Sequence, residues 1–187
     1  GTTRPPVEPD PDNEPLQRAV RPYEARLIRF GEDPSAELRL TGYEVDGGGC
    51  RFELNGRRWF RLAVPGRHNA LNALAAIATA QRFGLEQDEA GEILGEYEGA
   101  EMRLQQVRAG ELTIINDAYN ANPASMLAAA EVLTSVPGKR HLLVAGGMLE
   151  MGESAERLHR DVGLALARAG VDIVVGVGEM GGWIADG

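Results

Sequence analysis

The stretch of sequence that decides the fold is residues 112–123, which read LTIINDAYNANP. Residues 112–115 are apolar and mostly β-branched, a composition typical of a buried strand. Pro123 suits the first position of a helix, because the amide hydrogen that proline lacks is unpaired there anyway. Asn122 suits the N-cap in front of it. The polar residues in between therefore lie where a strand ends and a helix begins, and open α/β sheets bind ligands at that edge.

Polar side chains are more concentrated at this junction than a turn requires. Asp and Asn are ordinary turn residues, so turn chemistry explains Asn122 and one neighbour. It does not explain Asp117, Tyr119 and Asn120 so close together. We predict a binding site at the junction, with a simple capped turn as the alternative.

The residues after the junction alternate between helical and strand patterns. Three apolar strands separated by two helices are typical of a βαβαβ unit with a parallel sheet. Because three strands make a small core, we predict an incomplete Rossmann-like domain over 107–187. Its expected elements are a strand over 112–116, a helix over 123–135, a strand over 141–145, a helix over 154–169 and a strand over 172–177.

The residues before the junction have a different pattern, which we assign to another domain over 1–106. Residues 36–64 alternate between apolar and polar, and Asn55-Gly56 is a strong hairpin signal, so a small antiparallel sheet with one wet face is expected. Residues 1–15 are rich in proline and acids and predict a loose lead-in. The other expected elements are a helical turn over 16–22, a strand over 25–31 and helices over 70–83 and 87–97.

The composition limits the class of partner. The chain has 187 residues, 43% of them hydrophobic, and a net charge of -9, which argues against nucleic acid or an anionic membrane as the main partner. No apolar run is long enough to cross a bilayer. Cys50 is the single cysteine, so an internal disulfide is excluded, and the chain lacks a secretion-signal pattern. We therefore expect a cytoplasmic protein without membrane insertion.

Residues 176–181 (GVGEMG) match the G-x-G-x-x-G pattern of dinucleotide-binding proteins. The match follows the last expected strand rather than the first, so glycines needed for close packing are the favoured interpretation. A dinucleotide-dependent enzyme is the least favoured function. The phosphate-binding pattern G-x-x-x-x-G-K-[ST] does not occur in the sequence.

The three histidines, His68, His141 and His159, fall in different expected elements. Their spacing is not that of a metal site, so we predict no metal ligands in this chain. His159 shares a helix with Arg157 and Arg160, and we expect it to be exposed to solvent.

Residues 66–76 (GRHNALNALAA) open the helix expected over 70–83. Asn69 and Asn72 are three residues apart, so both amides lie on one face of the first turn and can address one planar ligand. Arg103 lies in the connector between the two expected domains. It reads either as a binding residue or as an ion-pair partner of Glu98 or Glu101.

Two stretches together resemble the Mur ligase family. Residues 66–76 are similar to its G-x-H-N-x-x-N-x-x-A-A signature. Residues 117–123 (DAYNANP) and 146–152 (GGMLEMG) resemble the branch that joins D-alanyl-D-alanine to UDP-N-acetylmuramoyl-tripeptide. The resemblance implies a cytoplasmic, monomeric ligase of peptidoglycan precursor synthesis that uses ATP and Mg²⁺ and passes through an acyl phosphate. Its partners would be small molecules: ATP, UDP-muramoyl-tripeptide and D-Ala-D-Ala. The chain would hold the end of the central ATPase domain and the start of the C-terminal domain.

The resemblance also implies a nucleotide site. Asn69 and Asn72 would contact the adenine, with His68 adjacent. Arg103 would reach the phosphates, and Asp117 would hold the ribose hydroxyls. These implied roles suit the chemistry, because amides read a base edge, a carboxylate accepts from two hydroxyls and a guanidinium matches phosphate oxygens.

The implied substrate cleft is lined by Tyr119, Asn120 and Asn122, for the nucleotide and the incoming dipeptide. Gly147 stands where the family usually has Asp, which predicts a weakened or altered acceptor site. No catalytic residue and no Mg²⁺ ligand is assigned within this chain.

Two readings of the whole chain remain open. The first is a fragment of the ligase, inactive in isolation because the phosphate-binding loop is missing. The alternative is a non-catalytic nucleotide-binding or interaction module derived from the same fold.

Overall fold

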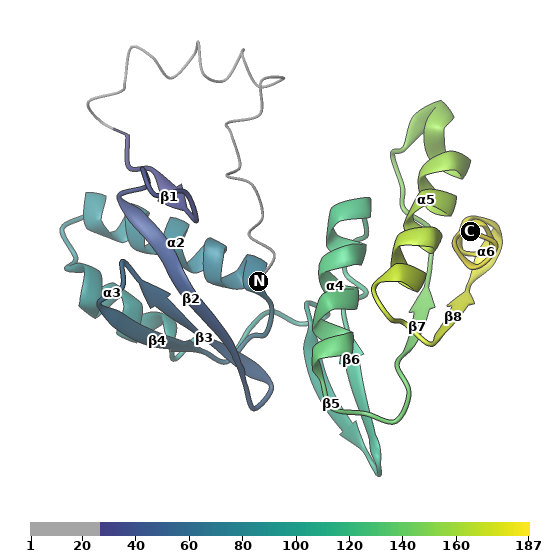
Figure 1. The fold of residues 1–187 in the computed structure, drawn as a ribbon, viewed down its shortest axis with the longest axis horizontal. Helices are drawn as coiled ribbons and strands as arrows, with labels where there is room; N and C mark the ends of the chain where they lie inside the picture. The colour runs from purple at the N-terminus through teal and green to yellow at the C-terminus, as the bar shows by residue number, and fades with distance from the viewer. Residues whose placement is uncertain (1–26) are drawn as a thin grey trace.

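The computed structural model describes residues 27–187, which form two α/β lobes joined by an extended linker (Figure 1). We call residues 27–94 the first lobe, residues 95–104 the linker and residues 105–187 the second lobe. Three expectations lie wholly or partly outside the described residues: the lead-in over 1–15, the helical turn over 16–22 and the start of the strand over 25–31.

The first lobe is built on a four-stranded sheet in the order β1-β2-β3-β4. The strands β2, β3 and β4 are antiparallel, as predicted, and the short β1 lies parallel to β2. Asn55 and Gly56 both have positive φ, 58° and 65°, which makes the tight turn that this dipeptide favours between β3 and β4. The strands are β1 (Phe30–Gly31), β2 (Leu38–Asp46), β3 (Gly49–Leu54) and β4 (Arg58–Leu62).

Two helices cover one face of this sheet, α2 (Arg67–Arg82) and α3 (Gln87–Leu94) (Figure 1). The core lies between α2 and the sheet, where Phe52, Leu54 and Leu74 are fully buried. The helix α2 begins three residues before the predicted start, because the chain enters it directly from Gly66 at φ 105°. The short connection over residues 63–66 therefore joins β4 directly to the first turn of α2.

The strand that anchors the sequence prediction, β6 (Leu112–Asn116), pairs antiparallel with β5 (Gln105–Ala109) in a separate two-stranded sheet. The prediction of a buried strand that joins the later parallel strands is wrong in this detail. Leu112 is 67% exposed and Ile114 is 46% exposed. Residues 105–109 are too polar to resemble a strand in the sequence, yet a turn at Gly110 (φ 62°) folds them back onto β6.

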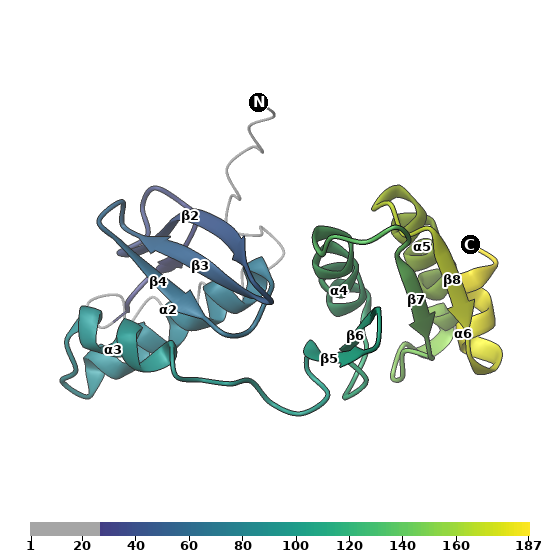
Figure 2. The ribbon, with the colours of Figure 1, turned by 90° about the horizontal axis from the view of Figure 1, so that it is seen from below.

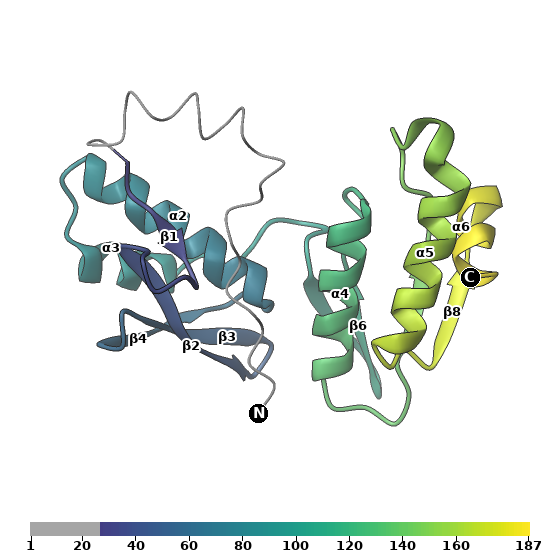
Figure 3. The ribbon, with the colours of Figure 1, turned by 45° about the horizontal axis from the view of Figure 1, so that its top comes forward.

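The rest of the second lobe has the predicted α/β alternation. The strands β7 (Leu142–Ala145) and β8 (Ile173–Gly176) pair in parallel. The helices α5 and α6 lie on one face of these strands, and α4 lies beside them (Figures 2 and 3). The helices are α4 (Pro123–Ser135), α5 (Ala155–Arg168), which follows a single 3₁₀ turn η3 (Gly152–Ser154), and α6 (Gly178–Ala185).

Each strand of the β7–β8 pair has one buried and one exposed side. Ala145, with Leu166 of α5 and Ile184 of α6, belongs to the core of the second lobe. Val144 and Val175, which are opposite each other in the register, are 62% and 42% exposed. The α/β class is thus as predicted, with helices on one face of the parallel pair.

The glycines of the G-x-G-x-x-G match serve close packing. A Cβ atom on Gly176 would lie 2.1 Å from the carbonyl oxygen of Gly181, and a Cβ on Gly181 would lie 2.5 Å from that of Ala145. Only glycine allows the backbones of β8, α6 and β7 to approach so closely. This packing supports the favoured interpretation of the motif.

Candidate functional site

The first turn of α2 presents the two asparagines of the GRHNALN stretch. Asn69 donates from Nδ2 to the carbonyl of Pro65 (2.7 Å) and accepts at Oδ1 from Nδ2 of Asn72 (3.3 Å). The two amides are therefore on one face, as the spacing predicts. Since Asn69 is held by the backbone and Asn72 is exposed, the pair forms an oriented polar surface at the start of the helix.

His68 lies close to the end of β6. Its imidazole folds back over Gly66, where a Cβ atom would lie 2.6 Å from the ring carbon Cε1. Burial lowers the pKa of His68, and the carboxylates of Asp117 and Glu131 oppose this effect. A residue of the first lobe and a residue of the second lobe thus interact electrostatically at the predicted nucleotide site.

Asp117 is half-buried directly after β6. Its Oδ1 accepts a hydrogen bond from the amide of Leu104 (3.1 Å). Burial raises the pKa of Asp117, while the Leu104 amide, His68 and Arg103 act in the opposite direction. The carboxylate therefore connects the linker to the junction, and its second oxygen has no hydrogen-bond partner among residues 27–187.

Arg103 stacks on Tyr119 instead of pairing with a neighbouring acid. The guanidinium carbon is 4.2 Å from the ring centroid, and the Tyr119 amide donates to the carbonyl of Met102 (3.2 Å). The flanking residues Met102 and Leu104 both have left-handed backbone, with φ of 58° and 51°. Such conformations are unfavourable for residues other than glycine and persist when surrounding contacts hold them. Of the described part of the chain, no acidic residue forms a salt bridge with Arg103, so the ion-pair reading with Glu98 or Glu101 does not hold.

The two asparagines before α4 have different surroundings. Asn122 is the N-cap, as predicted: its Oδ1 accepts from the Ser125 amide (2.9 Å) and its own amide donates to the Ser125 hydroxyl (3.0 Å). The capping reading therefore accounts for Asn122. Asn120 and Tyr119 are exposed, and within residues 27–187 the hydrogen bond of the Asn120 side chain is to the adjacent Ala121 amide (2.9 Å). A cleft role for these three residues stays a prediction.

The loop over residues 146–152 begins where β7 ends and is held by two side chains that the sequence did not indicate. The amide of Met148 donates to Nε2 of His159 (2.8 Å). Gly147 packs against α6, because a Cβ atom there would lie 2.8 Å from Cε of Met180. The expectation that His159 is exposed is wrong: it is fully buried, with its ring in edge contact with Trp183. Arg157 and Arg160 lie away from this buried side of α5, and each pairs with an acidic residue four positions along the helix, Asp161 or Glu156.

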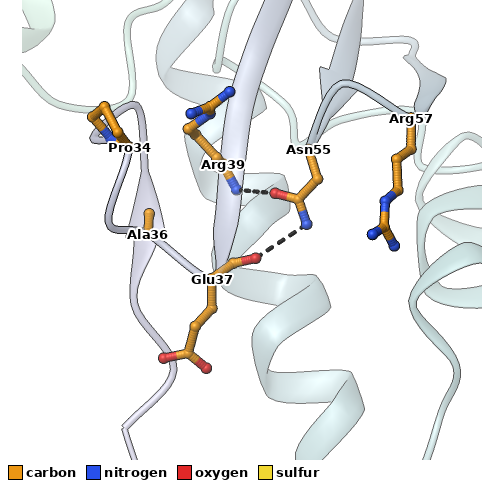
Figure 4. A pocket seen from close by; sticks show the side chains of 6 residues that line it. All are labelled: Pro34, Ala36, Glu37, Arg39, Asn55 and Arg57. Carbon is orange, nitrogen blue, oxygen red and sulfur yellow. Dashed lines mark hydrogen bonds between the residues drawn. The ribbon is translucent and has the colours of Figure 1, made fainter.

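A separate polar pocket lies at the other end of the first lobe, between the β1–β2 connection and the β3–β4 turn. Figure 4 shows Asn55 within it, accepting from the Arg39 amide (2.7 Å) and donating to the Glu37 carbonyl (3.1 Å). These bonds fix the hairpin turn to β2. None of the predicted site residues lines this pocket, whose walls are Pro34, Ala36, Glu37, Arg39, Asn55 and Arg57.

Neither a metal site nor a membrane span is found in the part of the chain that the structure describes. Residues 27–187 contain no group of three His, Cys, Asp or Glu side chains that could hold a metal ion. Within the same residues, every helix is too short or too polar to cross a membrane.

The second lobe and the last residues of the linker match a known family. Residues 102–186 correspond to the family model described as Mur ligase, glutamate ligase domain. Together with the relatives that follow, this match shows that the chain belongs to the Mur ligase family.

Similar curated proteins come from two branches of that family, the D-alanyl-D-alanine ligases and the UDP-N-acetylmuramate–L-alanine ligases. The UDP-N-acetylmuramoyl-tripeptide–D-alanyl-D-alanine ligase of Bacillus subtilis is 33% identical over 178 residues, which cover 94% of this chain and 38% of that protein. The Escherichia coli ligase of the same name is 37% identical over 159 residues, or 82% of this chain and 35% of that protein. The chain therefore spans less than half the length of these relatives.

Solved structures of MurF ligases have a fold similar to that of this chain. Crystal structure I of MurF from Acinetobacter baumannii has a TM-score of 0.78 and 33% identity, covering 84% of this chain and 35% of that one. A MurF ligase from Thermotoga maritima in complex with ADP has a TM-score of 0.77, covering 92% of this chain and 40% of that one. At 23% identity, the second likeness shows the fold alone.

Proposed function

We propose that this chain is part of an ATP-dependent ligase that adds D-alanyl-D-alanine to UDP-N-acetylmuramoyl-tripeptide in peptidoglycan precursor synthesis. The observation that carries the proposal is the meeting of two sequence motifs across the linker. The Asp117 carboxylate of the β6–α4 motif accepts a hydrogen bond from the Leu104 amide of the linker (3.1 Å), and it lies near enough to His68 of the α2 motif for each side chain to influence the pKa of the other. The two motifs are far apart in sequence, and a nucleotide site that both line requires this meeting.

Each nucleotide-binding role rests on the chemistry of its side chain. The Asn69–Asn72 pair offers amides to the adenine edge, and the Asp117 oxygen that has no partner within residues 27–187 accepts from ribose hydroxyls. Arg103, held over the Tyr119 ring, offers its guanidinium to the phosphate oxygens. Tyr119, Asn120 and Asn122 line the cleft where nucleotide and dipeptide meet.

The reaction proposed for the complete ligase proceeds through an acyl phosphate that the dipeptide amine attacks. In such phosphoryl transfers the protein contributes positioning and charge neutralisation. Because residues 27–187 contain no cluster of three metal-binding side chains, we assign no Mg²⁺ ligand to them and derive no step through the metal. We propose that the chain alone does not turn over, and that the complete ligase is a cytoplasmic monomer acting on small molecules.

The test measures ATP affinity and product formation in the complete ligase. We expect Arg103→Ala and Asn72→Ala each to weaken ATP binding about tenfold, the effect of losing one or two hydrogen bonds to a charged or buried group. Arg57→Ala is the matched control, since Arg57 is also an exposed arginine but lines the distant pocket. Equal effects of Arg103→Ala and Arg57→Ala would contradict the site.

Turnover distinguishes the proposal from the alternative function. The complete protein is incubated with ATP, UDP-N-acetylmuramoyl-tripeptide and D-Ala-D-Ala, and the pentapeptide product and phosphate are measured. Product formation supports the ligase. ATP binding without product would instead identify a non-catalytic nucleotide-binding module.

A further inference from the structure

His159 of α5 is a buried polar side chain that the proposed function does not use. Among residues 27–187 it is the one polar or charged residue that is buried, with 0% of its surface exposed. Both ring nitrogens have partners: Nδ1 lies 2.6 Å from the carbonyl oxygen of Ala155, and Nε2 lies 2.8 Å from the amide nitrogen of Met148. A buried histidine with two such partners has a defined orientation.

These partners determine the tautomer. The Ala155 carbonyl can only accept, so Nδ1 carries the hydrogen. The Met148 amide can only donate, so Nε2 carries no hydrogen and accepts this bond through its lone pair. These two partners require a neutral ring, which also makes a T-shaped contact with the Trp183 ring at a centroid distance of 5.7 Å.

The bond to Met148 fixes the loop over residues 146–152. Met148 is 1% exposed and belongs to the core of the second lobe. Ala121, in the middle of the predicted cleft segment, packs against the same core. The loop itself starts at the carboxyl end of β7, and its next residues, Leu149 and Glu150, are exposed, with Glu150 at φ 64°. The hydrogen bond between Met148 and His159 thus positions the loop. Met148 belongs to the same core against which Ala121 of the cleft segment packs.

We propose that His159 is a positioning residue for the acceptor side of the ligase reaction. Its neutral imidazole holds the Met148 amide, and this bond places the 146–152 loop relative to the 119–122 segment that receives the incoming dipeptide amine. This inference rests on the proposed function. The nucleotide side chains lie on α2, the linker and the end of β6, so His159 acts on dipeptide binding rather than on ATP binding.

The test uses three substitutions of His159 in the complete ligase. His159→Gln places a carbonyl oxygen near the position of Nε2 and can still accept from Met148. His159→Asn reaches only the position of Nδ1 and leaves the Met148 amide without an acceptor. His159→Leu removes both bonds and keeps an apolar side chain.

We expect the KM for D-Ala-D-Ala to rise about tenfold in the Asn and Leu variants, the effect of one buried amide left unpaired. The KM for ATP stays within about twofold, and His159→Gln restores most of the dipeptide KM. Equal KM values in the Gln and Asn variants, or a matching rise in the KM for ATP, would overturn the positioning role.

A measurement on the unmodified protein keeps the proposal testable if the variants fold poorly. The ¹⁵N chemical shifts of the His159 ring in the complete ligase report which nitrogen carries the hydrogen. We expect the hydrogen on Nδ1 and none on Nε2, and the opposite tautomer would overturn the proposal. An unmodified protein without ligase turnover would refute the proposed function instead, so the two failures are distinguishable.

Discussion

Arg103 of the linker lies over the ring of Tyr119 in the second lobe, with 4.2 Å between the guanidinium carbon and the ring centroid. Met102 and Leu104, on either side of Arg103, both have left-handed backbone. The Met102 carbonyl accepts from the Tyr119 amide, and the Leu104 amide donates to Asp117. The linker is thus attached to the junction by three separate interactions within three residues. This attachment holds the predicted phosphate-binding side chain beside the predicted ribose-binding side chain before any nucleotide arrives.

The stacking of Arg103 predicts how Tyr119 substitutions affect ATP binding in the complete ligase. An exposed cation–π contact is worth about 0.5–1 kcal/mol, so losing its orienting effect in Tyr119→Ala weakens binding about two- to fivefold. Tyr119→Phe keeps the ring face and binds ATP like the unmodified protein. Isothermal titration calorimetry measures both variants. Weak binding by Tyr119→Phe would mean that the hydroxyl, not the ring face, is what matters.

The raised pKa of Asp117 predicts a stability difference that depends on pH. Burial penalises the ionised carboxylate in the folded chain, so its pKa lies above the usual 3.8. Stability is therefore lost as the pH rises from 3.8 through the folded pKa. Asp117→Asn keeps an acceptor for the Leu104 amide and never ionises. Urea unfolding between about pH 4 and about pH 8 should show the free energy of unfolding of the variant rising relative to that of the unmodified chain as the pH increases. In the complete ligase, the same substitution should weaken ATP binding.

The lowered pKa of His68 predicts a change of the opposite sign. Burial favours the neutral ring, so the unfolded chain takes up a proton at a higher pH than the folded chain does. Stability is present above the usual pKa of 6.5 and is lost as the pH falls through the folded pKa. In His68→Gln this loss is absent. The free energy of unfolding of the two chains is measured as the pH falls from 6.5. Parallel curves of stability against pH would refute the prediction.

The contact of Gly147 with Met180 predicts the outcome of placing at position 147 the aspartate that the family resemblance implies. A Cβ atom at position 147 would lie 2.9 Å from Cβ and 3.1 Å from Sδ of Met180. Gly147→Ala and Gly147→Asp should therefore both destabilise the chain by about 1–3 kcal/mol. Met180→Ala removes the sulfur and the terminal methyl, so the destabilisation should be smaller in its background.

The same pair separates packing from acceptor chemistry. The prediction of an altered acceptor site requires that Gly147→Asp change dipeptide affinity in the complete ligase. The comparison is made between Met180→Ala and the double variant Gly147→Asp/Met180→Ala, where the added side chain meets fewer atoms. Unchanged affinity for D-Ala-D-Ala would refute the acceptor hypothesis and leave only a packing role for Gly147.

The close approach of Gly176 to Gly181 predicts that the G-x-G-x-x-G match is structural. Gly176→Ala places a methyl group 2.1 Å from a carbonyl oxygen, so thermal unfolding should show a loss of about 1–3 kcal/mol or more. The control is Gly182→Ala in the same helix, which meets nothing within 4 Å and should stabilise α6 by about 0.5–1 kcal/mol through its better helix propensity. Similar melting temperatures for the two variants would contradict the packing account.

Much of the fold follows from short stretches of sequence. The N-cap at Asn122, the helix start at Pro123 and the turn at Asn55-Gly56 were predicted and are present. Each depends on a few adjacent residues, whose backbone preferences act without the rest of the chain. The same holds for the alternation of helices and strands after residue 123.

Pairing of the strand over 112–116 was not predictable in the same way. Its partner, β5, consists of five exposed residues, so the periodic pattern that identifies strands is missing. A strand can pair with any available edge, and the choice depends on the turn at Gly110 and on where the linker leads. Composition alone therefore predicted a buried strand of the parallel sheet where a hairpin exists.

By itself, the sequence determined the class of fold, the positions of most helices and strands, and the residues of the two motifs, because these depend on local preferences and periodicity. Only the tertiary structure decided that the Leu104 amide bonds to Asp117, that Arg103 stacks on Tyr119 and that His159 is buried against Met148. Each of these contacts joins residues that are separated along the chain. Their energies exist only after the intervening elements have packed, so no local pattern in the sequence carries them.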